Sequence, residues 1–578
     1  MEPTITSTVR PTHYHKLLSL LLHQGLIWTP LVLGMGWLVI RPIGLHFSVM
    51  PGNYGDTRLI NYILEHFYRW ASGLEPAYWS PRMFYPFPLT LAFSDNLLGS
   101  GPFYALFRLF GLDREMALQG WYILGFGLNY LAAAFVLHKL RFHPLAVGMG
   151  AFFFTFSLPA LAQIGHLQLL YRFCVPLAVY LLWRFADRAR LWYLAGILVL
   201  LAWQLWNGIY LGVFLGILLA VMALLLPFTD PGTRGWKNIF AYWPERLQTA
   251  WNQSGTAGRL LVPGAAILFI ASTAALFMPY IQVTQLYQFN RSWAEVLSML
   301  PRPQSYLIAD HTPLWQPVSK HLGGVTMRHE HQLFLGIFPL ALLIVGTAAR
   351  FSTRQRPQAR NAAYSVAVLF ILTLVVGGVS LYYLIWLLPG MDSIRSVTRF
   401  QLVWLWPLAV FLAYAADGML ARAEKKPMLA FAAVLLAAGL LLEPAAVTYY
   451  QRYSTRHARE RLAQIRAQLP AEIPDDPILF LADRPDESEV VSEVDAMMLA
   501  QELGWATFNG YSGNEPPGYQ PAQSCAELPR RILNYLELTG KTDQSAYLAY
   551  MKRAVPVGFT DCDPGWWQAM PSLATLQP

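Results

Sequence analysis

Residues 53–70, NYGDTRLINYILEHFYRW, contain an acidic residue followed by a segment with two unlike sides. At helical spacing, apolar and aromatic residues fall on one side, while charged and polar residues form a stripe on the other. The apolar side carries Leu59, Tyr62, Ile63, His66, Phe67 and Trp70, and the polar stripe carries Arg58, Asn61, Glu65 and Arg69. Such a helix lies in the surface of a membrane rather than crossing it. The stretch therefore predicts a structured loop that rests on lipid headgroups.

The rest of the chain has the composition of a polytopic membrane protein. Of its 578 residues, 55% are hydrophobic and only 13% are charged, and such a chain belongs in a bilayer. Since a helix needs about 20 mainly apolar residues to cross the hydrocarbon layer, we predict a mainly α-helical transmembrane fold with about eleven spans. The predicted spans are 22–40, 119–138, 144–160, 169–184, 191–207, 210–228, 259–279, 332–349, 362–387, 399–418 and 428–446. No small-residue cleavage site follows the first span, so we expect a retained anchor.

Basic residues gather in alternate connectors between these spans. Because cytoplasmic loops are enriched in Lys and Arg, the chain is expected to start inside and to end outside. The basic connectors contain Lys16, Lys139 and Arg141, Arg184 to Arg190, Arg234 to Arg259, Arg350 to Arg360, and Arg422 to Lys426. The outer segments are then 41–118, 161–168, 280–331, 388–398 and everything after 447. The predicted location is the inner (plasma) membrane of a bacterium, and the net charge of +8 needs no nucleic acid to explain it.

A change in composition near residue 450 predicts two domains. Residues 1–447 form the transmembrane domain, with a first outer loop over 41–118 that contains two interfacial helices. Residues 448–578 form a small soluble domain of α/β or α+β type on the extracytoplasmic side. We expect a strand in PILFLAD, and helices over 487–503 and 528–538.

The outer domain also contains two of the three cysteines. Cys525 and Cys562 could form a disulfide in an oxidising compartment, but their spacing alone does not decide the matter. Cys174 lies inside an apolar run and is expected to be inert.

Several short stretches, taken in order, resemble the GT-C glycosyltransferases, which are integral membrane enzymes that take a sugar from a polyprenyl phosphate or diphosphate carrier. The stretches are Gly55-Asp56, FSDN at 93–96, RPQSYLIADHTPLW at 302–315, HEHQLFLG at 329–336, PGMDSIRSVTRF at 389–400 and NGYSGNEPPGY at 509–519. The resemblance covers the organisation of roughly residues 20–450. It implies transfer of the sugar to a glycan, lipid or protein acceptor at the outer face of the membrane.

Such a transfer needs a base for the acceptor hydroxyl and cations for the departing phosphate. Asp56 is our candidate base, because the GT-C pattern has its catalytic carboxylate in the first outer loop. Capping of the helix that begins at Thr57 is the alternative role for the same residue. Asp95 is a second candidate catalytic carboxylate, although in FSDN it stands where Asp commonly caps a helix.

Three arginines near the outer ends of spans are candidate ligands of the carrier phosphate. Arg395 and Arg399 lie about one helical turn apart, where guanidinium groups can fork onto a phosphate, and snorkelling to the interface is the alternative. Arg172 is the third. His166 and Gln168, on the same outer turn, are candidate substrate contacts, although structural hydrogen bonds would also explain them.

The sequence RHEHQ at 328–332 is a candidate metal or sugar site. His329 and His331 could bind a metal, although the HExxH spacing that places two histidines on one face is absent. Glu330 could contact a sugar. Some GT-C enzymes need a metal and others do not, so the resemblance allows one divalent cation, Mg²⁺ or Mn²⁺, as cofactor.

Other classes of membrane protein share some of these features. A transporter or flippase of lipid-linked sugars would show symmetry between two halves of the chain, and we find none. A polymerase or ligase of surface polysaccharide would concentrate its site in large later loops, and a non-catalytic scaffold also fits the composition. A transporter should tolerate Asp56→Asn far better than an inverting transferase.

Overall fold

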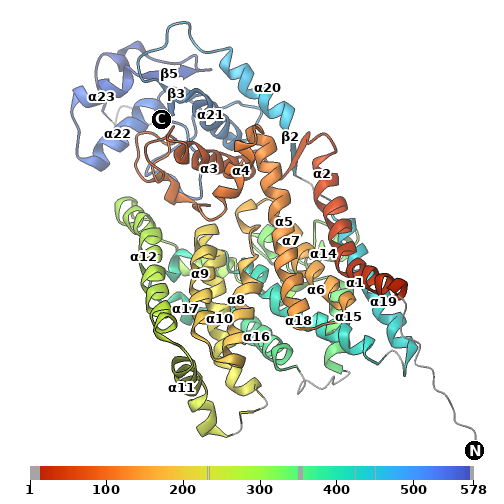
Figure 1. Cartoon of the computed structure of the whole chain (residues 1–578). Coiled ribbons are helices and arrows are strands. Elements are labelled where there is room, and N and C mark those ends of the chain that lie inside the picture. Colours follow the sequence, from red (N-terminus) through yellow and green to blue (C-terminus); the bar gives the residue numbers. More distant parts are fainter. Residues whose placement is uncertain are drawn as a thin grey trace, which may run out of the picture.

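The computed structural model describes residues 13–230, 232–233, 235–348, 356–422, 425–448 and 451–572. Three of the basic connector residues, Arg234, Arg350 and Arg354, lie outside the described residues. The described chain is mainly helical, with a bundle of long helices below a small α/β unit (Figure 1).

Eight helices of the described chain are long and apolar enough to cross a membrane. They are Leu21–Ile43, Arg114–Lys139, Pro144–Ala162, Leu167–Arg188, Ile209–Thr229, Thr256–Tyr287, Val397–Leu420 and Pro427–Ala446. They contain α1 (His13–Gly34), α2 (Arg41–Ile43), α5 (Arg114–Lys139), α6 (Pro144–Phe156), α7 (Leu158–Ala162), α8 (Cys174–Arg188), α10 (Ile209–Thr229), α12 (Thr256–Tyr287), α18 (Gln401–Leu420) and α19 (Pro427–Leu442). Two shorter apolar helices, α9 (Leu191–Asn207) and α15 (Ile337–Ala348), coincide with two further predicted spans.

The predicted span over 362–387 is helical in its first part only. There α16 (Pro357–Thr373) ends, and Gly377 and Gly378 follow with φ of +59° and +82°. Glycine adopts positive φ without the steric cost that other residues meet, so these two residues let the chain turn back. The apolar run therefore continues as a turn and the short α17 (Tyr383–Trp386) instead of a full span.

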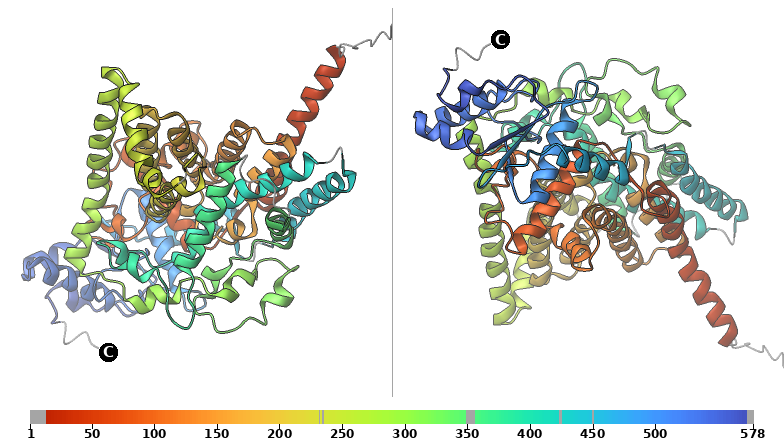
Figure 2. Two further views of the ribbon diagram at one scale, coloured as in Figure 1. Left: turned by 90° about the horizontal axis from the view of Figure 1, so that it is seen from below. Right: turned by 90° about the horizontal axis from the view of Figure 1, so that it is seen from above.

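The remaining helices lie at the two ends of the bundle. α3 (Asp56–Ala71) and α4 (Gly101–Leu109) lie across one end, between the bundle and the C-terminal domain, and α11 (Trp236–Asn252) lies at the other (Figure 1). Two short helices, α13 (Trp293–Ser298) and α14 (Gln316–Ser319), belong to the connection between α12 and α15. Seen along the bundle, α1 projects from one side and α12 stands at an edge (Figure 2).

The polar stripe of α3 is covered by protein. All residues of α3 from 57 to 67 are buried. Glu65 accepts a hydrogen bond from the Tyr104 hydroxyl at 2.8 Å and pairs with Arg108 at 2.9 Å, both on α4. Arg58 pairs with Asp495 of the C-terminal domain at 2.6 Å. α3 is therefore a packed helix at the end of the bundle, and not the open headgroup-bound helix that its pattern predicts, because its polar side chains find partners in the protein.

The C-terminal domain contains the small α/β unit that the composition predicts. β3 (Ile478–Leu481) is the centre of a parallel sheet of three strands, between β4 (Ala506–Thr507) and β5 (Ala554–Val557), with Ile478 opposite both Ala506 and Ala554. Its helices are α20 (Thr455–Arg466), α21 (Glu489–Leu503), α22 (Glu527–Thr539) and α23 (Gln544–Met551). A disulfide joins Cys525 to Cys562, the pairing that the sequence leaves open.

The first outer loop is joined to this domain by backbone hydrogen bonds. β1 (Val49–Pro51) pairs antiparallel with β2 (Arg452–Ser454). Further along the loop, the Tyr85 N–H donates to the Thr507 carbonyl, and the Thr507 N–H donates to the Arg82 carbonyl, each at 2.9 Å. The loop thus borders the C-terminal sheet at β4, and the position of α3 is tied to that domain.

A buried ion network stabilises the contact between α3 and the C-terminal domain. The two oxygens of Asp495 on α21 pair with Arg58 and Arg461, each at 2.6 Å. The side chains of Arg58 and Asp495 are only 1% exposed. Arg461 also pairs with Glu487 at 2.5 Å. Asp495 is thus the carboxylate on which the buried charge of Arg58 depends.

We expect Asp495→Asn to lower the free energy of unfolding by about 3 to 5 kcal/mol, because it leaves the buried guanidinium of Arg58 without a carboxylate. Thermal unfolding of the purified protein in detergent measures the loss. Glu460→Gln is the matched control, since Glu460 is 49% exposed and pairs with the exposed Arg456 at 2.7 Å, and exposed pairs contribute about 1 kcal/mol or less. Equal losses in the two variants would contradict this account of the interface.

Candidate active site

Asp56 begins α3 at the end of the bundle, next to the C-terminal domain. Its Oδ1 accepts a hydrogen bond from the Tyr511 hydroxyl at 2.7 Å, and its Oδ2 lies 3.7 Å from Nδ1 of His166. The side chain is 30% exposed, so the carboxylate can reach a bound molecule. The N-cap residue of α3 is Gly55, so the structure does not give Asp56 the predicted capping role.

Three further groups continue from Asp56 in a row. His166 lies between the two carboxylates, with its Nε2 3.6 Å from Oε1 of Glu330. Glu330 forms a two-pronged pair with Arg399, at 3.1 Å from Nε and 2.5 Å from Nη2. The Arg399 guanidinium also lies over the ring of Tyr210, 5.5 Å from its centre. We call Asp56, His166, Glu330 and Arg399 the charge row.

The charge row joins parts of the chain that are far apart in sequence. Its members and Tyr511 come from the first outer loop, the turn before α8, the connection between α12 and α15, the start of the α18 span, and the C-terminal domain. The alternation of basic connectors predicts that all of these segments lie on one side of the membrane. The structure brings these segments into mutual contact.

The electrostatics of the row distinguish its two carboxylates. Burial and the nearby charge of Arg399 lower the pKa of His166 to about 4, so this imidazole is neutral at neutral pH. Burial acts to raise the pKa of Glu330, but the charge and hydrogen bonds of Arg399 outweigh it and lower that pKa to about 2. Glu330 is therefore ionised, paired and a poor proton acceptor. Asp56 is the more exposed carboxylate of the row, with 30% of its side chain accessible against 3% for Glu330.

One group in the described chain has donor atoms close enough to suggest a metal site. His166, His329 and Glu330 each bring a donor atom within 4.8 Å of the others. Two imidazoles and one carboxylate suit Mn²⁺ or Zn²⁺ better than Mg²⁺, which prefers oxygen ligands. Both oxygens of Glu330 are bonded to Arg399, so a metal would compete with this guanidinium. The donor atoms therefore suit a cation of the Mn²⁺ type, but the pairing of Glu330 with Arg399 opposes its binding.

His331, the other predicted metal ligand, is not part of this group. Its Nδ1 is 2.8 Å from the Ser305 hydroxyl, and its Nε2 is 3.0 Å from the Ser298 carbonyl oxygen. Both ring nitrogens are thus engaged in the packing of the outer connection. The structure brings His166 to the place that the sequence pattern assigns to His331.

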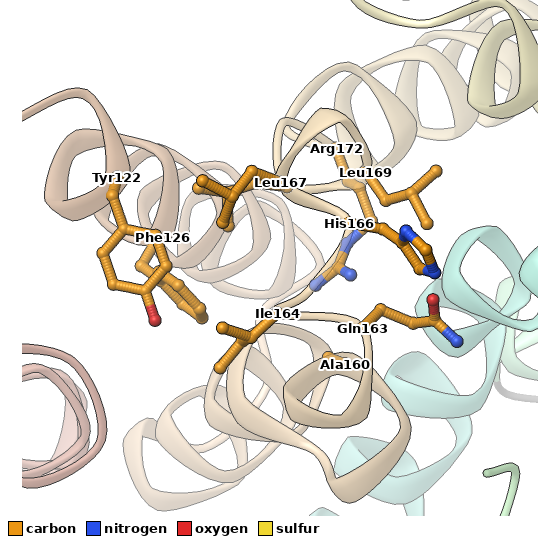
Figure 3. A pocket seen from close by; sticks show the side chains of 10 residues that line it. Tyr122, Phe126, Ala160, Gln163, Ile164, His166, Leu167, Leu169 and Arg172 are labelled. Carbon is orange, nitrogen blue, oxygen red and sulfur yellow. The ribbon is translucent and has the colours of Figure 1, made fainter. Parts of the chain in front are cut away.

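A pocket lies beside the charge row, at the start of the α8 span. Its side chains leave a volume of about 10 Å³, room for about one water molecule, and about 290 Å³ when the adjoining open solvent is counted. Figure 3 shows the side chains of Arg172 and His166 on one side of this pocket and the rings of Tyr122 and Phe126 on the other. The lining consists of Tyr122, Phe126, Ala160, Gln163, Ile164, His166, Leu167, Leu169, Leu170 and Arg172. The pocket is thus mainly apolar, with one guanidinium and few polar groups.

Arg172 is the cation of this pocket. It is 2% exposed and lies just before the N-terminus of α8, whose Val175 N–H donates to the Arg172 carbonyl. Its Nη2 donates to the Phe154 carbonyl at 3.2 Å, while its Nε has no hydrogen-bond partner among the described residues. Among those residues it also forms no ion pair with a carboxylate. A buried, uncompensated guanidinium beside a helix N-terminus attracts an anion.

Arg395 has a different environment from Arg172. Its Nη1 lies 2.9 Å from Oε1 of Glu295, and the same oxygen also pairs with Arg291 at 3.1 Å. The Arg395 N–H donates to the Tyr210 hydroxyl at 3.2 Å. Arg395 and Arg399 thus both have carboxylate partners, in contrast to Arg172. Of the three predicted phosphate ligands, Arg172 has the charge that an anion would neutralise.

Asp95 caps a helix, but not the one that its sequence context predicts. Its Oδ1 accepts the backbone N–H of Ile209 at 2.9 Å, which is the first residue of α10. Burial raises the pKa of Asp95, against the opposing effects of this hydrogen bond and of Arg399. Asp95 therefore holds the start of α10, and with it Tyr210, against the charge row.

Some contacts of the site are not predicted by the sequence. Gln168 lies in the turn before α8 but is not in the pocket lining, which contains Gln163 instead. Glu295, the partner of Arg395, lies in the short helix α13, where the sequence has no motif. Tyr511 belongs to NGYSGNEPPGY, whose resemblance to outer domains of bacterial GT-C enzymes is the only signal that could have indicated it.

The structure is similar to solved glycosyltransferases of the GT-C type. The arabinofuranosyltransferase AftD from Mycobacteria matches with 14% identity over 80% of this chain and 29% of that chain, at a TM-score of 0.42. The oligosaccharyltransferase of Archaeoglobus fulgidus in its apo form matches with 14% identity over 85% of this chain and 65% of that chain, at 0.47. The Archaeoglobus fulgidus enzyme AglB, in complex with an inhibitory peptide and a dolichol-phosphate, matches with 13% identity over 93% and 71%, at 0.47.

These likenesses concern the arrangement of the helices. The chain spans 29% and 65% of the length of the first two proteins. No family model and no curated protein matches the chain. The function is therefore argued below from the residues of the site.

Proposed function

We propose that the protein is a membrane glycosyltransferase that moves a sugar from a polyprenyl-phosphate carrier to an acceptor hydroxyl. The observation that supports this most directly is that one residue, His166, adjoins both the candidate base and the candidate phosphate site. His166 lies 3.7 Å from the Asp56 carboxylate and also lines the pocket that contains Arg172. A proton acceptor and an anion site therefore stand on either side of the same imidazole.

In this proposal Arg172 and the N-terminus of α8 bind the carrier phosphate. The apolar pocket wall next to Arg172 suits the first carbons of a polyprenyl chain, and its polar members suit the headgroup. Arg399 acts on the phosphate at longer range and holds Glu330 in its ionised form. Arg395, which shares Glu295 with Arg291, contributes a weaker positive field.

The chemical step is a single displacement with inversion at the sugar. The acceptor oxygen forms a bond to the anomeric carbon while the bond from that carbon to the phosphate oxygen breaks. The electron pair leaves with the carrier phosphate, and the acceptor proton goes to Oδ2 of Asp56. A positioned base of this kind contributes about 10²- to 10⁴-fold to a rate.

A cation held by His166, His329 and Glu330 would offset negative charge on the departing phosphate. The residues of the chain supply the rest of the proposed site. His166 is neutral at neutral pH, so the charge that would attract the phosphate is that of Arg172 and not that of the imidazole. Glu330 keeps the guanidinium of Arg399 oriented through two hydrogen bonds.

The proposed site faces the outer side of the inner membrane of a bacterium. The basic connectors support this orientation, because the site is built from the segments that lack them. The Cys525–Cys562 disulfide also fits an oxidising compartment outside the cytoplasm. The partners are then a lipid-linked sugar and a glycan, lipid or protein acceptor.

The experiment for this function is an assay of purified protein with a panel of polyprenyl-phosphate sugars and simple hydroxyl acceptors. We expect release of the free carrier phosphate, followed by mass spectrometry, and an inverted anomeric configuration in the product, followed by NMR. Retention of configuration would contradict the single displacement. If no lipid-linked sugar of the panel is consumed, the transporter or scaffold class is favoured instead.

A further inference from the structure

The C-terminal domain reaches the proposed base through a single side chain. Tyr511 lies in the segment after β4, and its hydroxyl donates to Oδ1 of Asp56 at 2.7 Å. The Asp56 side chain has two oxygens, and this bond engages one of them. The other, Oδ2, is directed toward His166 at 3.7 Å, beside the pocket of Arg172.

The position of Tyr511 relative to Asp56 is held by close packing. A Cβ atom added at Gly55 would lie 2.7 Å from Cγ1 of Val490 on α21 and 3.5 Å from the Tyr511 ring. The C-terminal domain therefore packs directly on the backbone that precedes Asp56. The Arg58–Asp495 pair fixes α3 to α21 two residues further on. The hydroxyl and the carboxylate are thus parts of one rigid contact.

The same loop of the C-terminal domain also reaches the other side of the site. Three residues after Tyr511, the Asn514 side-chain oxygen accepts from Nη2 of Arg291 at 2.5 Å, and the Gly513 carbonyl accepts from the same nitrogen at 3.2 Å. Arg291 pairs with Glu295, which pairs with Arg395. Residues 511–514 therefore bridge the first outer loop and the connection between α12 and α15.

We propose that Tyr511 is the positioning residue of the Asp56 base, so that the C-terminal domain completes the catalytic site. This inference rests on the proposed glycosyltransferase function. By engaging Oδ1, the Tyr511 hydroxyl fixes the rotation of the carboxylate and leaves Oδ2 to take the proton of the acceptor.

The chemistry of Tyr511 is suited to this role. Burial, reinforced by the negative charge of Asp56, raises the pKa of the Tyr511 hydroxyl, so that it remains a hydrogen-bond donor at every pH at which the protein is expected to work. The titratable and charged groups that face the Asp56–Tyr511 pair are His166, Glu515 and Arg395. None of them is altered when Tyr511 loses only its hydroxyl.

The test is Tyr511→Phe in the full-length protein, assayed with the polyprenyl-phosphate sugar that the wild type consumes. We expect kcat to fall about 10- to 100-fold, because the base is no longer held in the productive orientation, while KM for the donor changes little. A merely structural role for Tyr511 would instead lower the melting temperature of the protein and raise KM together with the loss of kcat.

Two further variants keep the inference testable. Tyr547→Phe is the matched control, because the Tyr547 hydroxyl is buried in the same domain and has no hydrogen-bond partner among the described residues. It should retain the wild-type kcat and KM. Asn514→Ala removes one of the two hydrogen bonds that hold the loop to Arg291, without touching Asp56 or Tyr511, and it should lower kcat less than Tyr511→Phe. If Tyr511→Phe fails to fold, this variant decides, since a loop that positions nothing would leave kcat unchanged.

The outcomes separate this inference from the function on which it rests. Wild-type turnover with an unchanged kcat in Tyr511→Phe would overturn the positioning role alone. A wild type that consumes none of the lipid-linked sugars would overturn both. Wild-type turnover with a lower kcat and an unchanged KM in Tyr511→Phe would support both.

Discussion

Asp56→Asn is expected to lower kcat for sugar transfer by about 10²- to 10⁴-fold, because the amide cannot accept the acceptor proton. The substitution keeps the size of the side chain and an oxygen that can accept the hydrogen bond from Tyr511. The fold should therefore be retained. Binding of the lipid carrier should also be retained, because Arg172 is unchanged. The measurement is the rate of carrier-phosphate release, together with binding of the free carrier.

Asp95→Asn is the matched control for this prediction. Asp95 uses Oδ1 to accept the Ile209 N–H at the start of α10, and an asparagine oxygen can accept the same bond. We expect its kcat to stay within about 10-fold of wild type, well above that of a variant that has lost a general base. Sugar transfer that survives Asp56→Asn would remove Asp56 as the base.

Arg172→Gln is expected to lower kcat/KM by about 10²- to 10³-fold, because it removes the uncompensated charge proposed to stabilise the departing phosphate. No carboxylate among the described residues pairs with Arg172, so the substitution leaves no buried anion behind and the protein should still fold. Arg172→Lys should recover part of the activity, because the charge remains while the forked donor geometry is lost. The measurement is the dependence of rate on the concentration of the lipid-linked sugar.

Arg395→Gln is the comparison that decides between the candidate cations. Because Arg395 shares Glu295 with Arg291, its charge is already balanced in part, and we expect a smaller loss than for Arg172→Gln. A larger loss for Arg395→Gln would place the carrier phosphate near the Glu295 group instead of in the pocket of Arg172.

Much of the fold follows from the sequence because hydropathy is a local property. The eight span-like helices and the two shorter apolar helices all fall on predicted runs. The prediction of a full span over 362–387 is wrong because hydropathy does not register the turn at Gly377 and Gly378.

The predicted placement of α3 on lipid headgroups is wrong for another reason. Its amphipathic pattern is the same whether its polar side meets headgroups or protein, and only the partners Asp495 and Tyr104 distinguish the two cases.

The candidate site could be predicted in part. The GT-C resemblance singles out Asp56, the RHEHQ stretch contains Glu330, and the positions of His166 and Arg399 near spans single out these two. The structure brings the four residues into one row. Their carboxylate and guanidinium partners depend on tertiary contacts, so the sequence does not indicate which cation remains uncompensated.

The helix that Asp95 caps begins 114 residues later in the chain, and no local rule could connect the two. His331 differs from His329 only by its packing against Ser298 and Ser305. Tyr511 reaches Asp56 across 455 residues. Each of these contacts is set by the way the domains pack, which residue spacing does not encode.

The central claim is that a carrier headgroup binds between the Asp56 carboxylate and the Arg172 guanidinium. A cryo-EM reconstruction of the protein with a non-hydrolysable polyprenyl-phosphonate sugar tests it most directly. We predict that the phosphonate lies within hydrogen-bond distance of Arg172 and that the sugar faces Oδ2 of Asp56. A headgroup bound at the opposite end of the bundle, near α11, or one in contact with neither side chain, would contradict the proposed reaction.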